Sequence, residues 1–295
     1  MVFTIFIGGL LEFNSGKTTV AKEIITFFEN EKSIITTPFK PLSGNNLFFH
    51  SPQIEEIVQK HSHFVSLDVL DLLSCSSNDV SPILVNPVHR VNTQAFPFYF
   101  SEEGTLNTFF SRFSGSVPLL QRFTTYSGGE ELKNTYILDE SIYSNQKFWT
   151  NRTLVDSVIE SNCLLKKYRS EHEYYALNGQ YYANAVQSCY DYLKTNSKII
   201  IIESFNDSAH PAWCIRDSDI VVIVGPGTMF VYEPQSYFRA IDNYRSINRN
   251  KPTTTDEIVK LAKPTKSIFL SGNPLKQKEE IKQLCLDICP KIEIN

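Results

Sequence analysis

One short stretch of the chain combines the residue types that bind phosphate groups: Asn14-Ser15-Gly16-Lys17-Thr18-Thr19. Glycine lets backbone N–H groups curl around phosphate oxygens, and the start of a helix adds a partial positive charge. In such a setting Lys17 can reach the β- and γ-phosphates of a nucleoside triphosphate, and the Thr18 hydroxyl can ligate Mg²⁺. We therefore expect these six residues to bind Mg²⁺ and a nucleotide, ATP or GTP.

The elements predicted around this stretch are those that phosphate binding needs. Val2 to Ile7 is a β-branched and aromatic run that predicts a buried strand, and Gly8-Gly9 ends it. After Gly16 the apolar residues recur at helical spacing, which predicts an amphipathic helix. The common spacing GxxxxGK[ST] would place its first glycine where Leu11 stands. The alternative is an ordinary helix start that contains GKTT by chance.

An acidic residue ends the most apolar strand that the sequence predicts, Lys198 to Glu203. Ligands of open α/β sheets bind at the carboxyl ends of the strands, so Glu203 can hold Mg²⁺ or its water shell there. The alternative is an acid that only marks the end of a strand. Asp207 and His210 in the following loop either face the same site or are solvated loop residues.

A lysine lies between two prolines directly after another predicted strand, Ser33 to Thr37. The segment Pro38-Phe39-Lys40-Pro41-Leu42-Ser43-Gly44 predicts a turn. One hypothesis makes Lys40 a cation close to the phosphates, where it would neutralise charge on a transferred phosphoryl group. The other makes it an exposed turn residue.

These three segments resemble one branch of the P-loop proteins, the dethiobiotin synthetases and the enzymes that amidate cobyrinic acid. That branch belongs to a larger group that includes the MinD and ParA ATPases. The chain is also similar to archaeal proteins described only as predicted P-loop ATPases or GTPases, which share the GGLL…SGKTT opening. The resemblance implies that Lys17 and Thr18 are the P-loop lysine and threonine. It likewise implies that Glu203 is the acid of the site and that Lys40 lies beside the substrate.

The resemblance covers residues 1–45 and 196–225, and the chain departs from the pattern elsewhere. Residues 46–195 match no part of it. The asparagine that selects the base after a late strand is replaced by Gly225-Pro226-Gly227, which leaves ATP or GTP open. No lysine stands at positions 11–15, where MinD and ParA proteins have one that acts across a dimer. This absence argues against a partitioning ATPase that is switched by dimerisation.

The remaining patterns predict an α/β protein with a doubly wound, mostly parallel sheet of the P-loop NTPase type. Unalternated apolar runs at 219–224 and 267–270 add strands. Helices are predicted from apolar spacing at 52–73, 153–167, 175–194 and 276–288. Between about 80 and 150, short apolar runs alternate with Gly/Ser/Asn loops, which predicts an inserted strand-rich subdomain. We therefore expect a single P-loop NTPase-like domain over 1–295 with this insertion.

Composition limits the classes of function. Of the 295 residues 42% are apolar, which suffices for a packed core and excludes a disordered chain. With 28 basic and 32 acidic side chains the net charge is −4, which argues against nucleic acid as a partner. No apolar run is long enough to cross a membrane, and the scattered cysteines form no CxxC pair. We therefore expect a soluble, cytoplasmic protein.

Two further pairs of residues favour a structural role over a chemical one. Cys285 and Cys289 lie four residues apart on a predicted amphipathic helix, which favours the core over metal binding. Asp68 and Asp71 lie three residues apart on another predicted helix. Solvated helix acids are the commoner case, and the alternative is that one of them completes a Mg²⁺ shell.

The residues together predict a Mg²⁺-dependent nucleotide enzyme, a hydrolase or ligase. The expected catalytic residues are Lys17, Glu203 and Lys40, and the expected metal ligands are Thr18 and Glu203. The leading hypothesis is a dethiobiotin-synthetase-like enzyme that acts on a small anionic substrate. The alternatives are a polynucleotide or small-molecule kinase, and a nucleotide-dependent switch that binds a protein partner. The sequence identifies neither the acceptor nor the oligomeric state, and a homodimer stays open.

Overall fold

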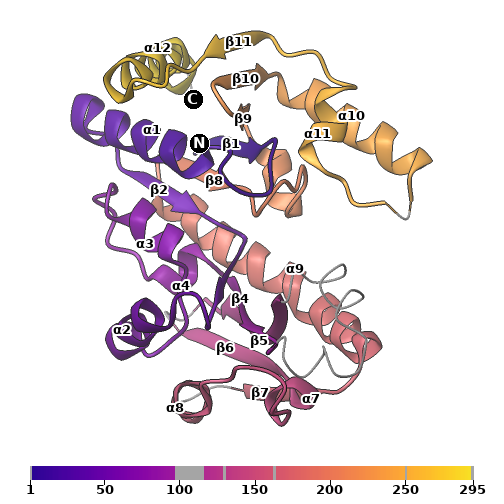
Figure 1. Cartoon of the computed structure of the whole chain (residues 1–295). Coiled ribbons are helices and arrows are strands. Elements are labelled where there is room, and N and C mark those ends of the chain that lie inside the picture. The colour runs from indigo at the N-terminus through magenta and orange to yellow at the C-terminus, as the bar shows by residue number, and fades with distance from the viewer. Residues whose placement is uncertain (1, 97–115, 129–130, 162–163, 250, 294–295) are drawn as a thin grey trace. The chain divides into compact units, whose positions relative to one another are not determined.

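The chain forms two compact units, each with helices packed on a sheet (Figure 1). The computed structural model describes residues 2–96, 116–128, 131–161, 164–249 and 251–293. The first unit comprises Met1–Pro41, Asp68–Val85 and Cys189–Asn295, and the second comprises Leu42–Leu67 and Asn86–Ser188. The predicted α/β class is confirmed. The second unit takes in most of the segment 80–150 together with residues on both sides of it, and the single-domain organisation stays a prediction.

Within the described residues, the first unit holds a six-stranded sheet in the order β11-β10-β9-β1-β8-β2. Its strands are β1 (Phe3–Gly9), β2 (Thr36–Phe39), β8 (Ile199–Glu203), β9 (Ile220–Gly225), β10 (Thr228–Tyr232) and β11 (Lys266–Phe269). The first four run parallel, whereas β10 and β11 are antiparallel to their neighbours. β1, β8 and β9 are buried along their whole length, as expected for strands covered on both faces.

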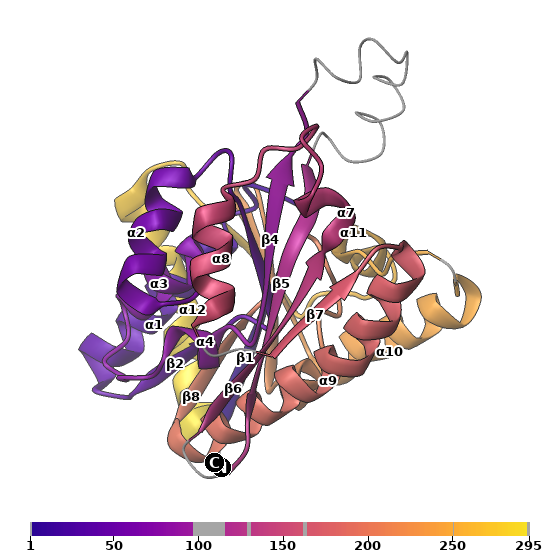
Figure 2. The same cartoon turned by 90° about the horizontal axis from the view of Figure 1, so that it is seen from below.

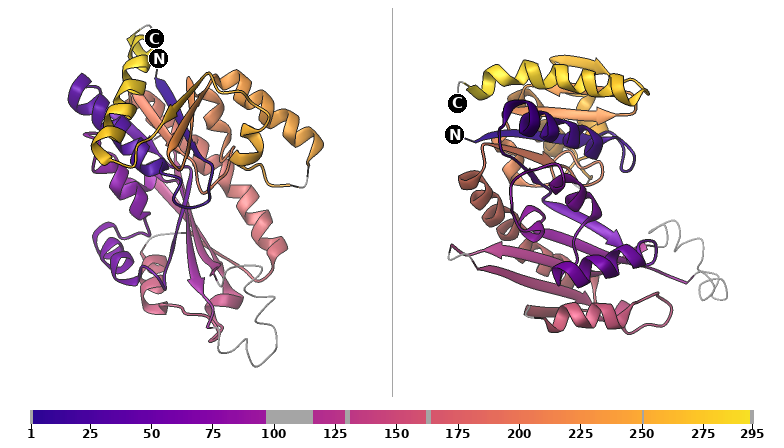
Figure 3. Two further views of the ribbon diagram at one scale, coloured as in Figure 1. Left: turned by 45° about the horizontal axis from the view of Figure 1, so that its top comes forward. Right: turned by 90° about the vertical axis from the view of Figure 1, so that its left-hand side faces the viewer.

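Helices cover both faces of this sheet. Residues Phe3, Ile5 and Ile7 of β1 share one apolar cluster with α1 and α12, which lie side by side (Figure 3). On the opposite face Phe6 packs against Tyr237 of α10, with 6.2 Å between ring centroids. The helices of this unit are α1 (Lys17–Lys32), α3 (Leu67–Leu73) from its second residue, α4 (Pro82–Val85), the end of α9 (Glu171–Asn196), a 3₁₀ turn (Trp213–Asp217), α10 (Pro234–Ile247), α11 (Thr255–Val259) and α12 (Pro274–Glu293).

The second unit has its own sheet, with five strands among the described residues, in the order β3-β4-β5-β6-β7 (Figure 2). These strands are β3 (Leu42–Asn46), β4 (Val88–Gln94), β5 (Ser116–Tyr126), β6 (Leu132–Asp139) and β7 (Leu164–Tyr168). β5 is antiparallel to β4 and β6, while the two outer pairs, β3 with β4 and β6 with β7, are parallel. The helices of this unit are α2 (Ser51–His61), α7 (Glu140–Tyr143), α8 (Arg152–Glu160) and the first part of α9.

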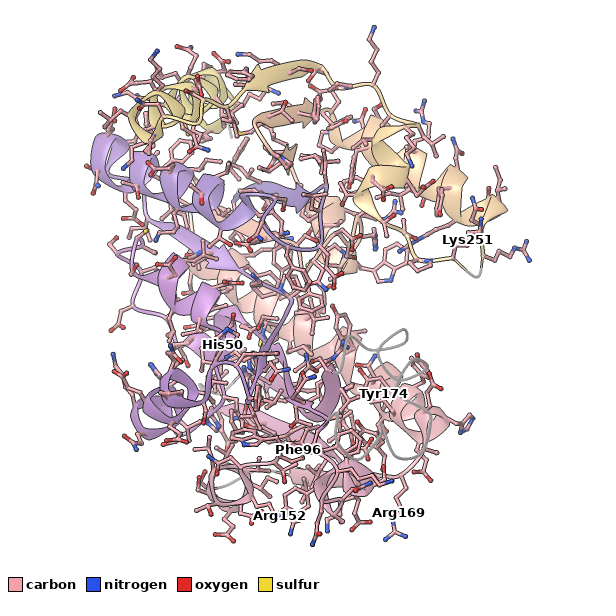
Figure 4. All side chains as sticks on the ribbon, viewed as in Figure 1. His50, Phe96, Arg152, Arg169, Tyr174 and Lys251 are labelled. Carbon is pink, nitrogen blue, oxygen red and sulfur yellow. The ribbon has the colours of Figure 1, made fainter. Side chains whose placement is uncertain are left out.

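The two faces of the second sheet differ in chemistry. On one face Val91 and Leu120 belong to an apolar cluster that includes residues of α2 and α8. Towards α9 the contacts include polar ones: Arg90 Nη2 donates to Tyr174 Oη (3.0 Å), and Tyr174 Oη donates to Gln121 Oε1 (3.0 Å), while the ring of Phe123 packs against that of Tyr181. Figure 4 labels Tyr174, which comes from α9. The alternation of β4 thus sends one side chain to the core and the next to a polar helix contact.

The helix predicted over 52–73 is wrong in its extent, because two helices, α2 and α3, occupy this segment. α2 ends at His61 because Ser62 takes a left-handed conformation (φ +58°) and donates its N–H to Val58 O. Phe64, between the helices, is fully buried in the apolar cluster of the second unit. The break therefore places in the core a side chain that a continuous helix would carry elsewhere.

The helix predicted over 153–167 is wrong at its end. α8 stops at Glu160, and Leu164–Tyr168 forms β7, which pairs in parallel with β6. A short run such as Leu-Leu-Lys-Lys-Tyr fits either structure by pattern alone, and pairing with a neighbouring strand decides between them.

The strand predicted over 33–37 begins later and includes a proline. β2 covers Thr36–Phe39, so Pro38 lies inside it. This strand is the edge of its sheet, where the missing N–H of proline need not cost a ladder hydrogen bond.

The turn predicted over 38–44 is wrong after Pro41, because Leu42 begins β3. Gly44 explains part of this pairing with β4. A Cβ atom at Gly44 would lie 2.9 Å from the backbone oxygen of Arg90, so the two strands approach closely only where a side chain is missing.

Cys285 is fully buried in the apolar cluster of the first unit, and Cys289 packs against that cluster. The predicted core role of this pair is confirmed. Among the described residues, no helix combines the length and the apolar character needed to cross a membrane.

His63, which follows α2, gives the second unit a dependence of stability on pH. The ring lies 3.2 Å (Nδ1) from Tyr136 Oη and 3.4 Å (Nε2) from Asn134 Nδ2, an amide donor, which fits a neutral ring. Burial and the nearby Arg122 lower the pKa of His63 to about 4. Because the unfolded chain binds this proton near pH 6.5, we expect the free energy of unfolding to fall as the pH drops from 6.5 towards 4.

The expected loss from His63 is about 1 to 2 kcal/mol, less than a fully buried ring would give. Urea unfolding at pH 7 and pH 4.5 measures it, and His63→Gln should reduce the difference between the two pH values. His172→Gln, at an exposed position of α9, serves as the control. An equal pH difference in His63→Gln and wild type would contradict this assignment.

Candidate functional site

The loop 10–16 between β1 and α1 curls back on the end of β1. Leu10 N donates to Val224 O of β9, and Asn14 and Gly16 take left-handed conformations (φ +57° and +89°) before the helix begins. Gly9 permits the curl, since a Cβ atom there would lie 2.4 Å from Ser15 Oγ and 2.7 Å from Lys17 Nζ. The early glycine thus leaves room for the two side chains that fold over it.

Lys17 begins α1, and its side chain is buried against the strand end. Its Nζ donates to Ser15 Oγ (3.1 Å). Burial lowers the pKa of the Lys17 ammonium, Glu203 opposes this shift, and the charge of Lys40 adds to it. An anion bound beside the Lys17 ammonium would favour its charged form and so oppose the effect of burial.

Glu203 is held beside β1 by the pairing of the central strands. The register aligns Glu203 with Ile7, and Ser204 N donates to Ile7 O (2.9 Å). The side chain is only 1% exposed, and its Oε1 accepts hydrogen bonds from Thr18 Oγ1 (3.1 Å) and Lys40 Nζ (2.7 Å). Its Oε2 is buried and has no hydrogen-bond partner among the described residues. A buried carboxylate oxygen without a partner can accept a cation, or a hydrogen bond from a donor group of a ligand.

Lys40 follows β2 and is buried rather than exposed. Its residue is 3% exposed, and its Nζ lies 2.7 Å from Glu203 Oε1 and 2.6 Å from Asp68 Oδ2. Burial disfavours the charge of the Lys40 ammonium, but the two carboxylates outweigh it and raise the pKa. The hypothesis of an exposed turn residue is therefore wrong. The pairing of Phe39 with Ile202 places the next residue level with Glu203.

Asp68 joins the cluster from the first turn of α3; the sequence pattern named it only together with Asp71, as one of two acids of which either could complete a Mg²⁺ shell. Its side chain is 54% exposed, so it lies between the buried lysine and the surface. Asp71, three residues later, pairs instead with Lys22 of α1 (2.7 Å). The spacing of the two acids gave no way to choose between them. The contact that distinguishes Asp68 is the ion pair with Lys40, which depends on tertiary structure.

The other residues predicted for the site lie around the start of α1 and in the loop after β8. Asn14 and Thr19 are exposed, whereas Ser15 is buried. The loop after β8 contacts the loop 10–16, because Asn206 Nδ2 donates to Glu12 Oε1 (2.9 Å). The charge of Asp207 acts on the pKa of Lys17, as a minor effect after burial and the nearer charges.

His210 contacts a different set of side chains. Its Nε2 accepts a hydrogen bond from Arg216 Nε (3.3 Å), and its ring packs edge-on against Trp213. Burial, Arg245 and Arg216 lower the pKa of His210 to about 4.

The cluster made of Lys17, Thr18, Lys40, Asp68 and Glu203 has the chemistry of a cation and phosphate site. Hydroxyl and carboxylate oxygens are the ligands that Mg²⁺ prefers, and the orphaned Glu203 Oε2 is available to such a cation. No group of three or more His, Cys, Asp or Glu side chains among the described residues could hold a metal by itself. Comparisons with protein-family models, with curated proteins and with solved structures find no match to this chain.

Proposed function

We propose that the chain is a P-loop NTPase with a doubly wound fold, which binds Mg²⁺ and ATP or GTP at the loop 10–16. One observation carries this proposal: Glu203, a buried carboxylate at the carboxyl end of a central parallel strand, accepts a hydrogen bond from Thr18 and keeps one oxygen without a partner. Ligands of open parallel sheets bind at this edge, and the start of a helix such as α1 favours phosphate there.

Each residue of the cluster has a separate task in this proposal. Lys17 and the backbone N–H groups of the loop hold the β- and γ-phosphates. Thr18, Glu203 and Asp68 supply the oxygen ligands for Mg²⁺. The bound metal would supply positive charge that neutralises the phosphate oxygens during transfer. Glu203 also holds Thr18 and Lys40 in place through its Oε1.

Lys40 favours transfer to a small anionic substrate over simple nucleotide binding. Its ammonium is held between the buried carboxylate of Glu203 and the exposed carboxylate of Asp68. The cluster therefore reaches solvent on the side of Asp68. A cation fixed in this way can neutralise charge on a transferred phosphoryl group and orient an anionic acceptor. These features support a dethiobiotin-synthetase-like reaction, in which a substrate carboxylate or carbamate is phosphorylated.

Calorimetry with Mg·ATP and Mg·GTP, each repeated with EDTA, tests the nucleotide site. We expect one of the two to bind in the presence of Mg²⁺ and much more weakly without it. Mass spectrometry of small molecules that co-purify with the chain would then supply acceptor candidates. Phosphate release that depends on such a small acid favours the synthetase reaction, whereas release that depends on a protein partner favours a switch. Absence of binding by both nucleotides would refute the proposal.

Lys40→Met should strengthen the binding of a divalent cation in the absence of nucleotide. The Lys40 ammonium is bonded to Glu203 Oε1 and Asp68 Oδ2, so its positive charge lies beside both carboxylates that the proposal gives to the metal. The ammonium therefore competes with a metal for the negative charge of the same two carboxylates. Removal of the ammonium should lower the Kd for Mn²⁺ by about tenfold, because one competing positive charge is lost. A tenfold change in Kd corresponds to roughly 1.4 kcal/mol of binding free energy. Electron paramagnetic resonance of free Mn²⁺ measures this Kd directly.

The same variant should be less stable without metal, because Glu203 remains as a buried charge that has lost its closest cation, at a cost of about 3 to 5 kcal/mol. Mn²⁺ should recover part of that loss in thermal unfolding. Lys22→Met is the matched control. It removes the surface partner of Asp71, which lies on α3 as Asp68 does. Equal Mn²⁺ affinity in Lys40→Met and wild type would separate Lys40 from the cation site.

A further inference from the structure

A second candidate site lies at the opposite edge of the six-stranded sheet, where the parallel strands begin. A cavity of about 640 Å³ is lined there by Arg216, Ser218 and Asp219, which precede β9, and by residues of α10 and its N-cap. Asp219 ties the cavity to the beginning of β1, because its Oδ2 accepts a hydrogen bond from Thr4 N (2.8 Å). The volume is in the range of small-molecule sites. The cavity shares no lining residue with the cluster of Lys17 and Glu203.

One face of α10 forms a wall of this cavity. Phe238, Arg239 and Asp242 line it at positions that lie on one side of a helix, while Tyr237 and Ile241 point into the core. Glu233 and Pro234 at the helix start also line it. Among the described residues no side chain caps this 14-residue helix; Pro234 has no N–H, and the N–H groups of Ser236 and Tyr237 donate to Glu233 O, so the N–H of Gln235 is the one in the first turn left for an acceptor.

Ser218 supplies an independent indication of a ligand. The residue lines the cavity and is only 5% exposed, yet its Oγ has no hydrogen-bond partner among the described residues. A buried hydroxyl without a partner costs about 1 to 3 kcal/mol. Such a group is expected where a ligand completes the hydrogen bond.

Arg216 is fixed in the wall of the cavity. Its guanidinium donates to both oxygens of Asp242 and stacks on the rings of Trp213 and Phe238, with 5.0 and 5.4 Å to the ring centroids. This pair is therefore largely neutralised. Arg239, in contrast, is exposed and has no hydrogen bond or ion pair to any described residue.

The charges that remain select the chemistry of the ligand. The free donors are the Ser218 hydroxyl, the Arg239 guanidinium and the N–H of Gln235 at the start of α10, which together favour a carboxylate. The Glu233 side chain is 59% exposed, and its one ion pair with a described residue is the 3.8 Å contact to Lys291, so its charge can attract a cation. The lining contains two arginines and three acids. A strongly anionic ligand such as a phosphate is disfavoured by this balance, whereas a ligand with one charge of each sign matches it.

We propose that this cavity binds a small zwitterion with a free amine and a carboxylate, either an amino acid or a short peptide. The carboxylate is held by Ser218, Arg239 and the amino end of α10, and the amine faces Glu233. Phe238 provides an apolar surface for the side chain of the ligand. This site does not depend on the proposed nucleotide function.

A thermal-unfolding screen tests the proposal with the full chain, using the twenty free amino acids and a set of alanyl dipeptides as probes at 10 mM. We expect at least one probe to raise the melting temperature, and the better of the two classes identifies the source of the zwitterion. Calorimetry then compares that probe with its N-acetylated and its C-amidated forms, each of which lacks one charge. Both should bind at least about tenfold more weakly.

Variants locate the binding. Arg239→Gln should weaken the best probe by about tenfold and Ser218→Ala by about fivefold. Arg249→Gln, at an exposed position beyond α10, is the matched control and should leave the affinity unchanged. Lys17→Ala should also leave it unchanged, because Lys17 does not line the cavity. The proposal is overturned if no probe raises the melting temperature, if the capped forms bind as well as the zwitterion, or if Arg239→Gln binds it with wild-type affinity.

Discussion

Replacement of Lys17 with alanine is expected to reduce Mg·ATP affinity at least about a hundredfold, a loss of roughly 3 kcal/mol. The ammonium lies against the end of β1 next to Ser15, in the position from which the proposed site needs a cation on the phosphates. Since burial lowers the pKa of Lys17, the folded chain gains little from this charge in the absence of an anion. The variant should therefore unfold at nearly the wild-type temperature.

Isothermal titration calorimetry measures the affinity, and circular dichroism on the same sample shows that the chain is folded. Lys22→Ala is a suitable control. It removes a lysine from the same helix whose partner is the surface acid Asp71, and it should bind nucleotide normally. Unchanged Mg·ATP affinity in a folded Lys17→Ala chain would remove the basis for nucleotide binding at this loop.

Glu203→Gln should separate binding from turnover. The amide keeps the shape of the side chain and can still accept hydrogen bonds from Thr18 and Lys40, but it loses the charge that would organise Mg²⁺. We expect Mg·ATP to bind within a fewfold of wild type while phosphate release falls by roughly two or more orders of magnitude. Single-turnover phosphate release at saturating nucleotide isolates this step from binding.

Asp217→Asn controls for the loss of one negative charge, because Asp217 pairs with Lys194 at the surface, before the start of β9. It should release phosphate at the wild-type rate. If Glu203→Gln does the same, the metal role belongs to another acid, and Asp207 is the first to test because its charge reaches Lys17.

The positions of residues that depend only on the local sequence pattern could be predicted from the sequence. Gly16, Lys17 and Thr18 lie between a strand and a helix that the structure contains, and the four isoleucines before Glu203 form the strand that places it. The roles assigned to these residues stay predictions. What the pattern could identify is the meeting of two chain segments at one sheet edge, since parallel strands bring their carboxyl ends together.

Asp68 could not be predicted in the same way. Its place in the cluster depends on where α2 ends, which a left-handed Ser62 decides, and on an ion pair with Lys40 across 28 positions of sequence. β7 and β10 show a related limit. A short apolar run becomes a strand when a neighbour pairs with it, as β6 does with β7 and β9 with β10, and no property of the run itself records that neighbour.

The order of the strands also has a consequence for how the chain matures on the ribosome. β1 emerges first, but both of its partners, β8 and β9, come from the part of the chain that is made after the whole second unit. Until those strands have emerged, β1, which is mostly apolar and buried in the folded unit, has no neighbour to pair with. The second unit can close earlier, because Asn86–Ser188 forms most of it. During translation this nascent chain therefore carries an exposed aggregation-prone strand, a feature that calls for chaperone protection until the last third of the chain arrives.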